Sequence, residues 1–111
     1  MDLEVKRLVT EVVDDLAKLE VVLFFHAHPN FIDSAARIAR RMGSEESKVD
    51  AALQALSEAG FVERFVLGEG RYILYAYSQS PRVRRLVERL SRAYHEDPGQ
   101  RQEMVRMLLK L

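Results

Sequence analysis

The 111-residue chain contains no cysteine and no tryptophan, and it has only five glycines and three prolines. Without cysteine it can form neither a disulfide nor a thiolate metal site. Hydrophobic residues make up 48% of the sequence and charged residues 31%, which is typical of a globular domain and not of a disordered segment. At this length we expect a single domain over residues 1–111.

Long apolar runs are also missing. The run VVLFF, at Val21–Phe25, is far too short to cross a bilayer. The first residues, MDLEVKRL, are charged and have no apolar signal core behind them. We therefore expect a soluble, cytoplasmic protein with no membrane partner.

Net charge is zero at neutral pH, because 17 basic residues balance 17 acidic ones. Small DNA-binding domains are usually basic, since phosphate neutralisation supplies much of their affinity, so the overall charge argues against nucleic acid. The charge is segregated, however. Residues 34–43 hold three arginines and no acid, residues 44–60 hold four acids against one lysine, and residues 81–111 hold eight bases against four acids. Basic segments therefore flank an acidic one.

Motifs for catalysis are lacking as well. The sequence has no Gly-rich phosphate loop, nucleophile elbow or paired-carboxylate motif, so we expect neither an enzyme nor a bound cofactor. His26 and His28 are metal-binding residue types, but two histidines at this spacing cannot share one helix face. We interpret them as a pair at a helix end, where the dipole favours positive charge, and expect no metal site.

The first third of the chain has the periodicity of helices. An apolar stripe from Val5 to Leu23 has helical spacing. Asp14–Asp15 could cap a new helix within it, so one long helix and two consecutive helices both remain open. Pro29 ends the segment, and Phe31–Ile32 is expected to form a short extended piece.

Two short helices and a hairpin should follow. Asp33 and Ser44 are the expected N-caps of the two helices, and Gly43 is placed to end the first in a left-handed conformation. Residues 61–67 and 71–78 then predict a hairpin around the turn sequence GEG. Both hairpin faces are apolar, whereas a ribbon with one solvated face alternates more cleanly. We therefore expect something to cover part of its second face.

Proline marks the starts of the last two helices. Ser80-Pro81 and Asp97-Pro98 each combine a capping residue with a proline in the first helical turn. Gln100 stands three residues after Asp97, as in a capping box. These signals predict helices in the region 80–111.

The segment IARRMGSEESKVDAALQALSEAGFVER, residues 38–64, carries a recognisable pattern. It resembles the core of winged helix-turn-helix transcriptional regulators of the MarR and ArsR kind, and the resemblance covers roughly residues 15–78. It implies a mainly α fold with a small β-hairpin (α+β), with extra terminal helices at about 2–14 and 80–111. The residues that carry the pattern are Ile38-Ala39, Met42, Gly43, Val49, Leu53, Leu56 and Gly60-Phe61-Val62.

The resemblance implies that outward positions of the helix 45–58 and of the hairpin turn contact DNA, while flanking arginines hold phosphates. Glu45, Glu46 and Asp50 complicate this, because carboxylates at a groove repel phosphate. They could instead point aside and only stabilise the helix N-terminus. The arginines after residue 80 could likewise be a solvated face with Arg84–Glu88 and Arg92–Glu96 pairs. The expected DNA-binding residues are Ser47, Lys48, Gln54, Arg71, Arg37, Arg40, Arg82, Arg85 and Arg89.

The terminal helices are more apolar than a core of this size needs. We expect the surplus to form a homodimer, which would place two recognition helices over paired half-sites. Two functions stay open: a dimeric DNA-binding transcriptional regulator, or a module that docks another protein through its acidic helix or apolar hairpin. The expected dimer-interface residues are Leu8, Val12, Leu86, Leu90, Met104 and Leu108.

Overall fold

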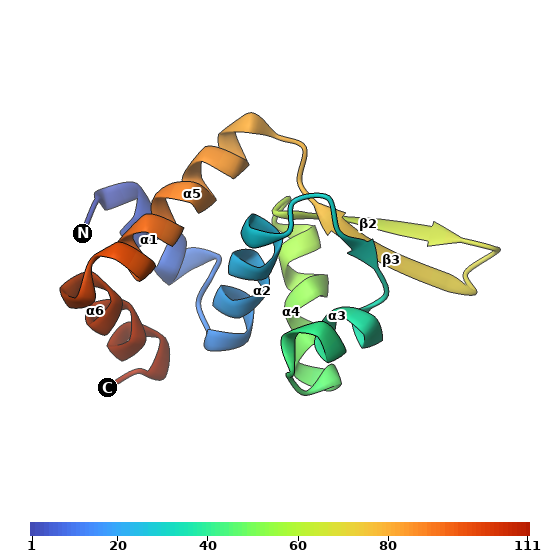
Figure 1. Ribbon diagram of the computed structural model, residues 1–111, viewed down its shortest axis with the longest axis horizontal. Helices are drawn as coiled ribbons and strands as arrows, with labels where there is room; N and C mark the ends of the chain where they lie inside the picture. The colour runs from blue at the N-terminus through green and yellow to red at the C-terminus, as the bar shows by residue number, and fades with distance from the viewer.

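The computed structural model describes residues 1–111 as six helices and one antiparallel three-stranded sheet (Figure 1). This confirms the predicted α+β winged helix with additional terminal helices. No helix has the length and apolar character needed to span a membrane. The helices are α1 Leu3–Glu11, α2 Leu16–Ala27, α3 Ala35–Met42, α4 Glu46–Glu58, α5 Pro81–Glu96 and α6 Pro98–Leu109, and the strands are β1 Ile32–Asp33, β2 Val62–Leu67 and β3 Tyr72–Tyr77.

The stripe at the start of the chain forms two helices, because Asp15 caps a new one by accepting from the Lys18 N–H at 2.8 Å. Two predicted caps were wrong by one residue. Ser34, not Asp33, caps α3, and Glu45 precedes α4 without a side-chain capping bond. Ser44 instead donates its hydroxyl to the Glu20 carboxylate at 3.3 Å.

Other local signals are confirmed. Gly43 adopts φ +68° between α3 and α4, a conformation that glycine enters without steric cost. Ser80 caps α5 with Pro81 in its first turn. Asp97 caps α6 by accepting from the Gln100 N–H at 3.1 Å, and the Gln100 amide donates back to the same carboxylate.

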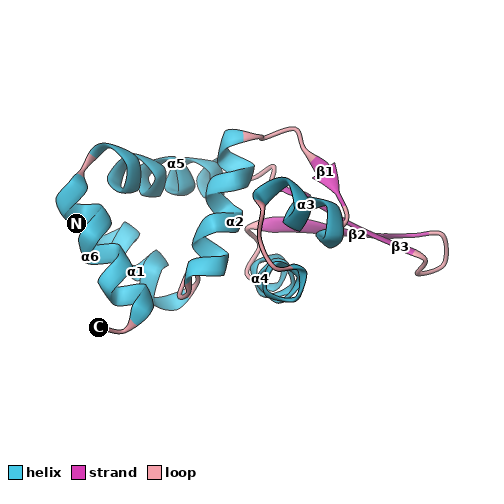
Figure 2. Ribbon diagram, turned by 60° about the horizontal axis from the view of Figure 1, so that its bottom comes forward, coloured by secondary structure: helices cyan, strands magenta, loops and turns pink.

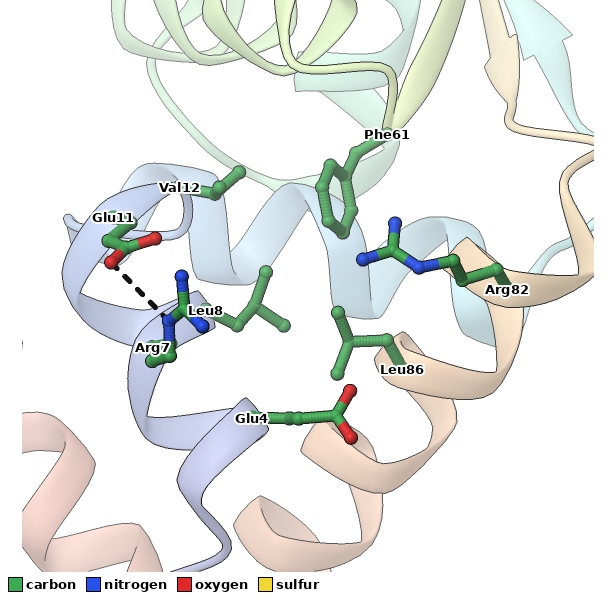
Figure 3. Close-up of a pocket in the computed structure, with 8 residues that line it drawn as sticks. All are labelled: Glu4, Arg7, Leu8, Glu11, Val12, Phe61, Arg82 and Leu86. Atoms are coloured by element: carbon green, nitrogen blue, oxygen red, sulfur yellow. Dashed lines mark ion pairs between the residues drawn. The ribbon is translucent and has the colours of Figure 1, made fainter.

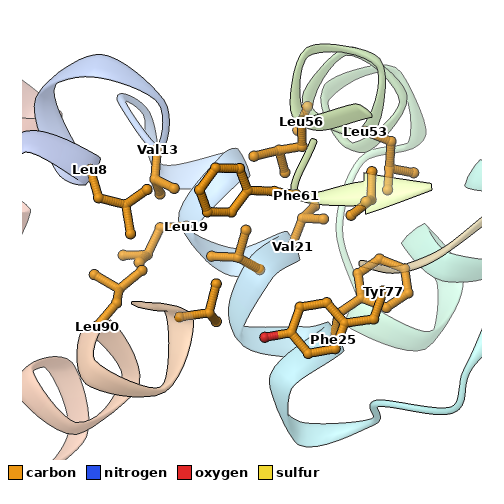
Figure 4. Close-up of a cluster of buried hydrophobic side chains, with 14 of the residues drawn as sticks. Leu8, Val13, Leu19, Val21, Phe25, Leu53, Leu56, Phe61, Tyr77 and Leu90 are labelled. Carbon is orange, nitrogen blue, oxygen red and sulfur yellow. The ribbon is translucent and has the colours of Figure 1, made fainter. Parts of the chain in front are cut away.

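Helix α2 lies at the centre of the molecule. Figures 1 and 2 show α1, α5 and α6 on one side of it and α3, α4 and the sheet on the other. Leu19, Val21, Val22 and Phe25 of α2 are all buried, which explains why VVLFF is apolar almost all round. Figure 4 shows the resulting continuous core, with Leu90 of α5 at one end and Leu53 of α4 at the other.

This packing corrects most of the predicted dimer interface. Leu8, Leu90, Met104 and Leu108 are buried in the core of their own chain, so they offer no surface to a partner. The prediction was wrong because the terminal helices pack against α2 and one another, and that already uses their apolar stripes. Val12 and Leu86 are only half-buried and remain at a surface.

The sheet has the order β1-β3-β2, and the β2–β3 hairpin projects well beyond the helices (Figure 1). Val62, Tyr75 and Tyr77 share its inner face and are buried against the helices. On the outer face Glu63, Leu74 and Ala76 are half-buried, and Ile32, Phe65, Leu67 and Tyr72 are exposed. The expected partial cover therefore leaves these four side chains exposed within a single copy.

Candidate nucleic-acid interface

Helices α3 and α4 form the helix-turn-helix. Ile38 and Ala39 of α3 and Val49 and Leu53 of α4 are buried where the two helices meet. This burial turns the opposite side of α4 outward. The structure brings three of the predicted DNA-binding residues together on that exposed side: Ser47, Lys48 and Gln54.

Each of these three side chains is held by an acid of the same segment. The Ser47 hydroxyl donates to a Glu45 carboxylate oxygen at 2.9 Å, and the Lys48 ammonium lies 3.8 Å from the other oxygen. The Gln54 amide donates to Asp50 at 2.8 Å. Glu45 and Asp50 therefore do not simply point aside. These contacts are exposed, so DNA could displace them at a cost of about 0.2–1 kcal/mol each.

Helix α3 carries three arginines, which differ in the contacts that their guanidinium groups make. The Arg37 guanidinium lies 3.7 Å from Asp33, and Arg41 lies over the Phe31 ring at 5.2 Å from its centroid. Arg40 is exposed and makes no ion pair. Of the two predicted phosphate contacts on this helix, Arg40 is therefore free and Arg37 is partly neutralised.

The hairpin, or wing, presents Arg71 at its tip. Gly68, Glu69 and Gly70 all have positive φ, which closes the turn tightly, and Arg71 follows as an exposed residue without an ion pair. Arg64 is equally exposed and unpaired. It lies opposite Tyr75, which places it on the inner, helix-facing side. The predicted set omitted Arg64, and its exposure follows only from the reach of the hairpin beyond the helices.

The structure does not bring the predicted α5 arginines beside α4, because α5 lies on the other side of α2 (Figure 1). Arg89 is paired with Asp2 and lies 3.6 Å from Glu4, so it joins α5 to the start of the chain. The same contact holds the pKa of the Asp2 carboxyl below its usual value. Arg85 is exposed and unpaired.

Arg82 lines a pocket of about 250 Å³ between α1, α5 and the start of β2. Figure 3 shows its guanidinium near Phe61 and Leu86, across the pocket from Glu4. The pocket combines apolar walls with charges of both signs, including an Arg7–Glu11 pair at 3.6 Å. A phosphate backbone would not fit this arrangement, since opposite charges already balance there.

The joint between β3 and α5 uses Arg84. Its Nε donates to the Ser78 carbonyl at 2.7 Å, and its guanidinium lies 4.6 Å from the centroid of the Tyr77 ring. The pairs Arg84–Glu88 and Arg92–Glu96 do not form, and Glu88 instead lies 3.3 Å from Arg92. Arg84 is therefore part of the scaffold that positions the wing.

No family model matches the chain, and no curated protein matches it in sequence. Two solved structures share its fold. A protein of Methanosarcina mazei Go1 described as a possible transcriptional regulator aligns with TM-score 0.61 and 17% identity, over 88% of this chain and 84% of that one. A MarR-family transcriptional regulator of Silicibacter pomeroyi aligns with TM-score 0.57 and 21% identity, over 96% of this chain and 76% of that one. These likenesses confirm the resemblance to MarR-type regulators at the level of the fold.

Proposed function

We propose that this chain is a transcriptional regulator that binds duplex DNA as a homodimer. The observation that carries the proposal is the placement of two exposed elements. Helix α4 presents Ser47, Lys48 and Gln54 on an open surface, and the wing beside it presents Arg64 and Arg71 without ion pairs. An exposed helix of this size fits a major groove, and arginines of a hairpin beside it can reach the neighbouring phosphates or minor groove.

The acids of α4 set the expected strength of binding. Glu45, Glu46 and Asp50 lie among the proposed readers and oppose the phosphates on both sides of a groove. Phosphate contacts would therefore come from the unpaired arginines around α4, which are Arg40, Arg64 and Arg71. We expect weak binding to random duplex and a steep loss of affinity with salt.

The proposed dimer uses the surface that the terminal helices leave open. Val12 and Leu86 are half-buried there, and Leu3, Leu109 and Leu111 are exposed. A two-fold contact through these helices would leave both copies of α4 and of the wing free. Light scattering at micromolar concentration measures the mass, and a monomer would contradict this part of the proposal.

The first experiment is a fluorescence titration of labelled random duplex at two salt concentrations. Arg71→Ala should weaken binding several-fold and reduce the salt slope by about one, because it removes a phosphate contact. Lys48→Ala should also weaken binding, because it removes a proposed contact with the bases. Lys6→Ala on α1 removes the same charge away from the interface and serves as the control. If the folded protein binds no duplex at low salt, DNA binding is excluded.

Glu45→Gln tests the role of the acids directly. The substitution keeps the side-chain size but removes the charge that holds Ser47 and Lys48. We expect affinity for duplex to rise about two- to fivefold, the range that an exposed ion pair provides. Glu58→Gln, at the other end of α4, is the matched control. A loss of affinity on Glu45→Gln would instead mean that the carboxylate itself helps to bind DNA, as an acceptor for cytosine for example.

A second function, docking of another protein, is favoured by the uncovered apolar face of the wing and by the acidic start of α4. It predicts that the folded chain binds no duplex at low salt. It also predicts that Glu45→Ala/Glu46→Ala weakens the complex with a protein partner. If this double substitution leaves the affinity for the protein partner unchanged, the start of α4 is not part of the docking surface.

A further inference from the structure

The outer wing face is an uncovered apolar surface on a three-stranded sheet. Strand register places its members side by side: Ile32 lies beside Ala76, Ala76 beside Glu63, Leu74 beside Phe65, and Tyr72 beside Leu67. Glu63, at the base of β2, is the only charged residue on this side of the sheet, and the name used below covers its apolar members. The outer wing face is defined by Ile32, Phe65, Leu67, Tyr72, Leu74 and Ala76.

Four of the six side chains of the outer wing face are exposed to solvent, and Leu74 and Ala76 are half-buried. Tyr72 is 61% exposed, Leu67 50% and Ile32 49%. Solvent faces of antiparallel sheets usually carry polar residues, and contiguous apolar patches on soluble proteins usually mark interaction sites. Apart from Glu63 at the base, no polar side chain interrupts this patch.

We propose that the outer wing face packs against the same face of a second copy, with the two hairpins antiparallel about a two-fold axis. The shape of the face supports this choice of partner. Its largest and most exposed side chain, Tyr72, stands at the tip, and its smallest, Ala76, lies at the base of the same strand. If the two faces pack antiparallel, with the two-fold axis passing near Leu74 and Phe65, Tyr72 of each copy lies over Ala76 of the other.

Charge supports the same arrangement. The face carries no unpaired cation, and its one carboxylate, Glu63, already accepts from the Gln79 N–H at 3.3 Å. In the antiparallel register Glu63 of each copy lies over Leu67 of the other, so the two Glu63 carboxylates stay at opposite ends of the contact. The antiparallel arrangement also brings the tip of one wing, which holds Glu69 and unpaired Arg71, to the end of the other wing that holds Glu63. Arg71 is the cation at that end that can pair with the Glu63 carboxylate.

The size of the face sets the strength of the contact. Stable interfaces bury about 800 Å² on each partner, and six partly exposed side chains provide less than that. We expect association that depends on concentration and not a permanent dimer. The contact is separate from the terminal helices, and it leaves the inner side of the wing, with Arg64, open. It therefore goes beyond the proposed DNA binding and does not depend on it.

Sedimentation velocity on the full chain without DNA tests the contact. The weight-average mass of the wild type should rise across the micromolar to near-millimolar range. Leu67→Asp should remove that rise by placing a carboxylate in the apolar contact. Val66→Asp is the matched control, since Val66 is 52% exposed on the inner face of the same strand. Circular dichroism checks that both variants are folded.

Two outcomes overturn the proposal: a wild-type mass that does not change with concentration, or equal effects of the two aspartate substitutions. Neither outcome bears on DNA binding, because no DNA is present. Loss of duplex binding with the mass rise intact would, conversely, overturn only the proposed function.

Chemical cross-linking tests the antiparallel register, and the natural absence of cysteine removes any background. Facing sheets lie about 10 Å apart, too far for a direct disulfide, so a short bis-maleimide reagent is the suitable probe. A mixture of Tyr72→Cys and Ala76→Cys chains should cross-link between the two variants. Tyr72→Cys alone should stay uncross-linked. The opposite result would establish a parallel pair and overturn the arrangement.

Discussion

The base and the tip of the wing hairpin are built from similar residues but differ in what surrounds them. Tyr75 and Tyr77 at the base are each 2% exposed, whereas Tyr72, on the same strand, is 61% exposed. The base is covered by helices, and Tyr77 stacks on Phe25 of α2 with ring centroids 6.1 Å apart. The tip extends past them. Tyr75 and Tyr77 lie on the inner face that the helices cover, whereas Tyr72 lies at the tip and on the outer face. Strand register and the reach of the helices, and not residue type, therefore decide which tyrosines belong to the core.

The largest expected effect is a difference in stability between the two ends of strand β3. Tyr75→Ala should lower the free energy of unfolding by about 3–5 kcal/mol, because it empties a filled core site. Tyr72→Ala should change it by about 0.5 kcal/mol or less, since the ring is mostly in water. Urea denaturation measures both values. Similar losses from the two substitutions would show that the tip is as firmly packed as the base.

An intermediate loss of stability is expected at the joint between β3 and α5, which holds the base of the hairpin. Arg84→Ala should lower the free energy of unfolding by about 1–2 kcal/mol, because it removes a charged hydrogen bond to the Ser78 carbonyl and the contact with the Tyr77 ring. Arg85→Ala, on the exposed side of the same helix, is the control and should be near neutral. Thermal unfolding followed by circular dichroism separates the two. Equal losses of stability in the two variants would show that the Arg84 contacts do not stabilise the joint between β3 and α5.

The smallest effect concerns the Tyr77 hydroxyl, which is buried and has no hydrogen-bond partner. Burial raises the pKa of this phenol from 10.0 to about 12. The unfolded chain loses the proton near pH 10 while the folded chain keeps it, so the wild type should lose stability as pH rises from 10 to 12. Tyr77→Phe should lack that part of the loss and should be equal or up to about 1 kcal/mol more stable at pH 7.

Unfolding of the wild type and Tyr77→Phe at pH 7, 10 and 11.5 checks this expectation. Other groups titrate in both proteins, so the difference between the two isolates Tyr77. A constant difference across the three pH values would mean that the hydroxyl is solvated in the folded state.

Local sequence signals predicted much of the fold. Asp97-Pro98 and Ser80-Pro81 begin helices where expected, and Gly43 makes the left-handed turn, because capping and positive φ depend on a few neighbouring residues. Cap positions shifted by one residue at Ser34 and Glu45, where two adjacent polar residues compete for the same role.

Long-range packing accounts for the predictions that failed. Leu90 and Met104 have the apolar spacing of an interface, but the same spacing suits a core, and periodicity does not distinguish the two. Arg82, Arg85 and Arg89 are close together in sequence, yet one faces a pocket, one faces water and one binds Asp2. Asp2, the partner of Arg89, and the α1 residues of the pocket that Arg82 lines lie more than seventy residues away in the chain.

The sequence by itself determined the winged helix-turn-helix, since the apolar, alanine and glycine positions of residues 38–64 admit few other arrangements. It also showed the acids of α4 and the apolar wing as departures from a typical DNA-binding surface. Only the tertiary structure decided what those departures do. In the structure Glu45 and Asp50 accept hydrogen bonds from Ser47 and Gln54, two of the proposed DNA-binding residues. The apolar side chains of the outer wing face stay exposed because burial depends on contacts between distant segments.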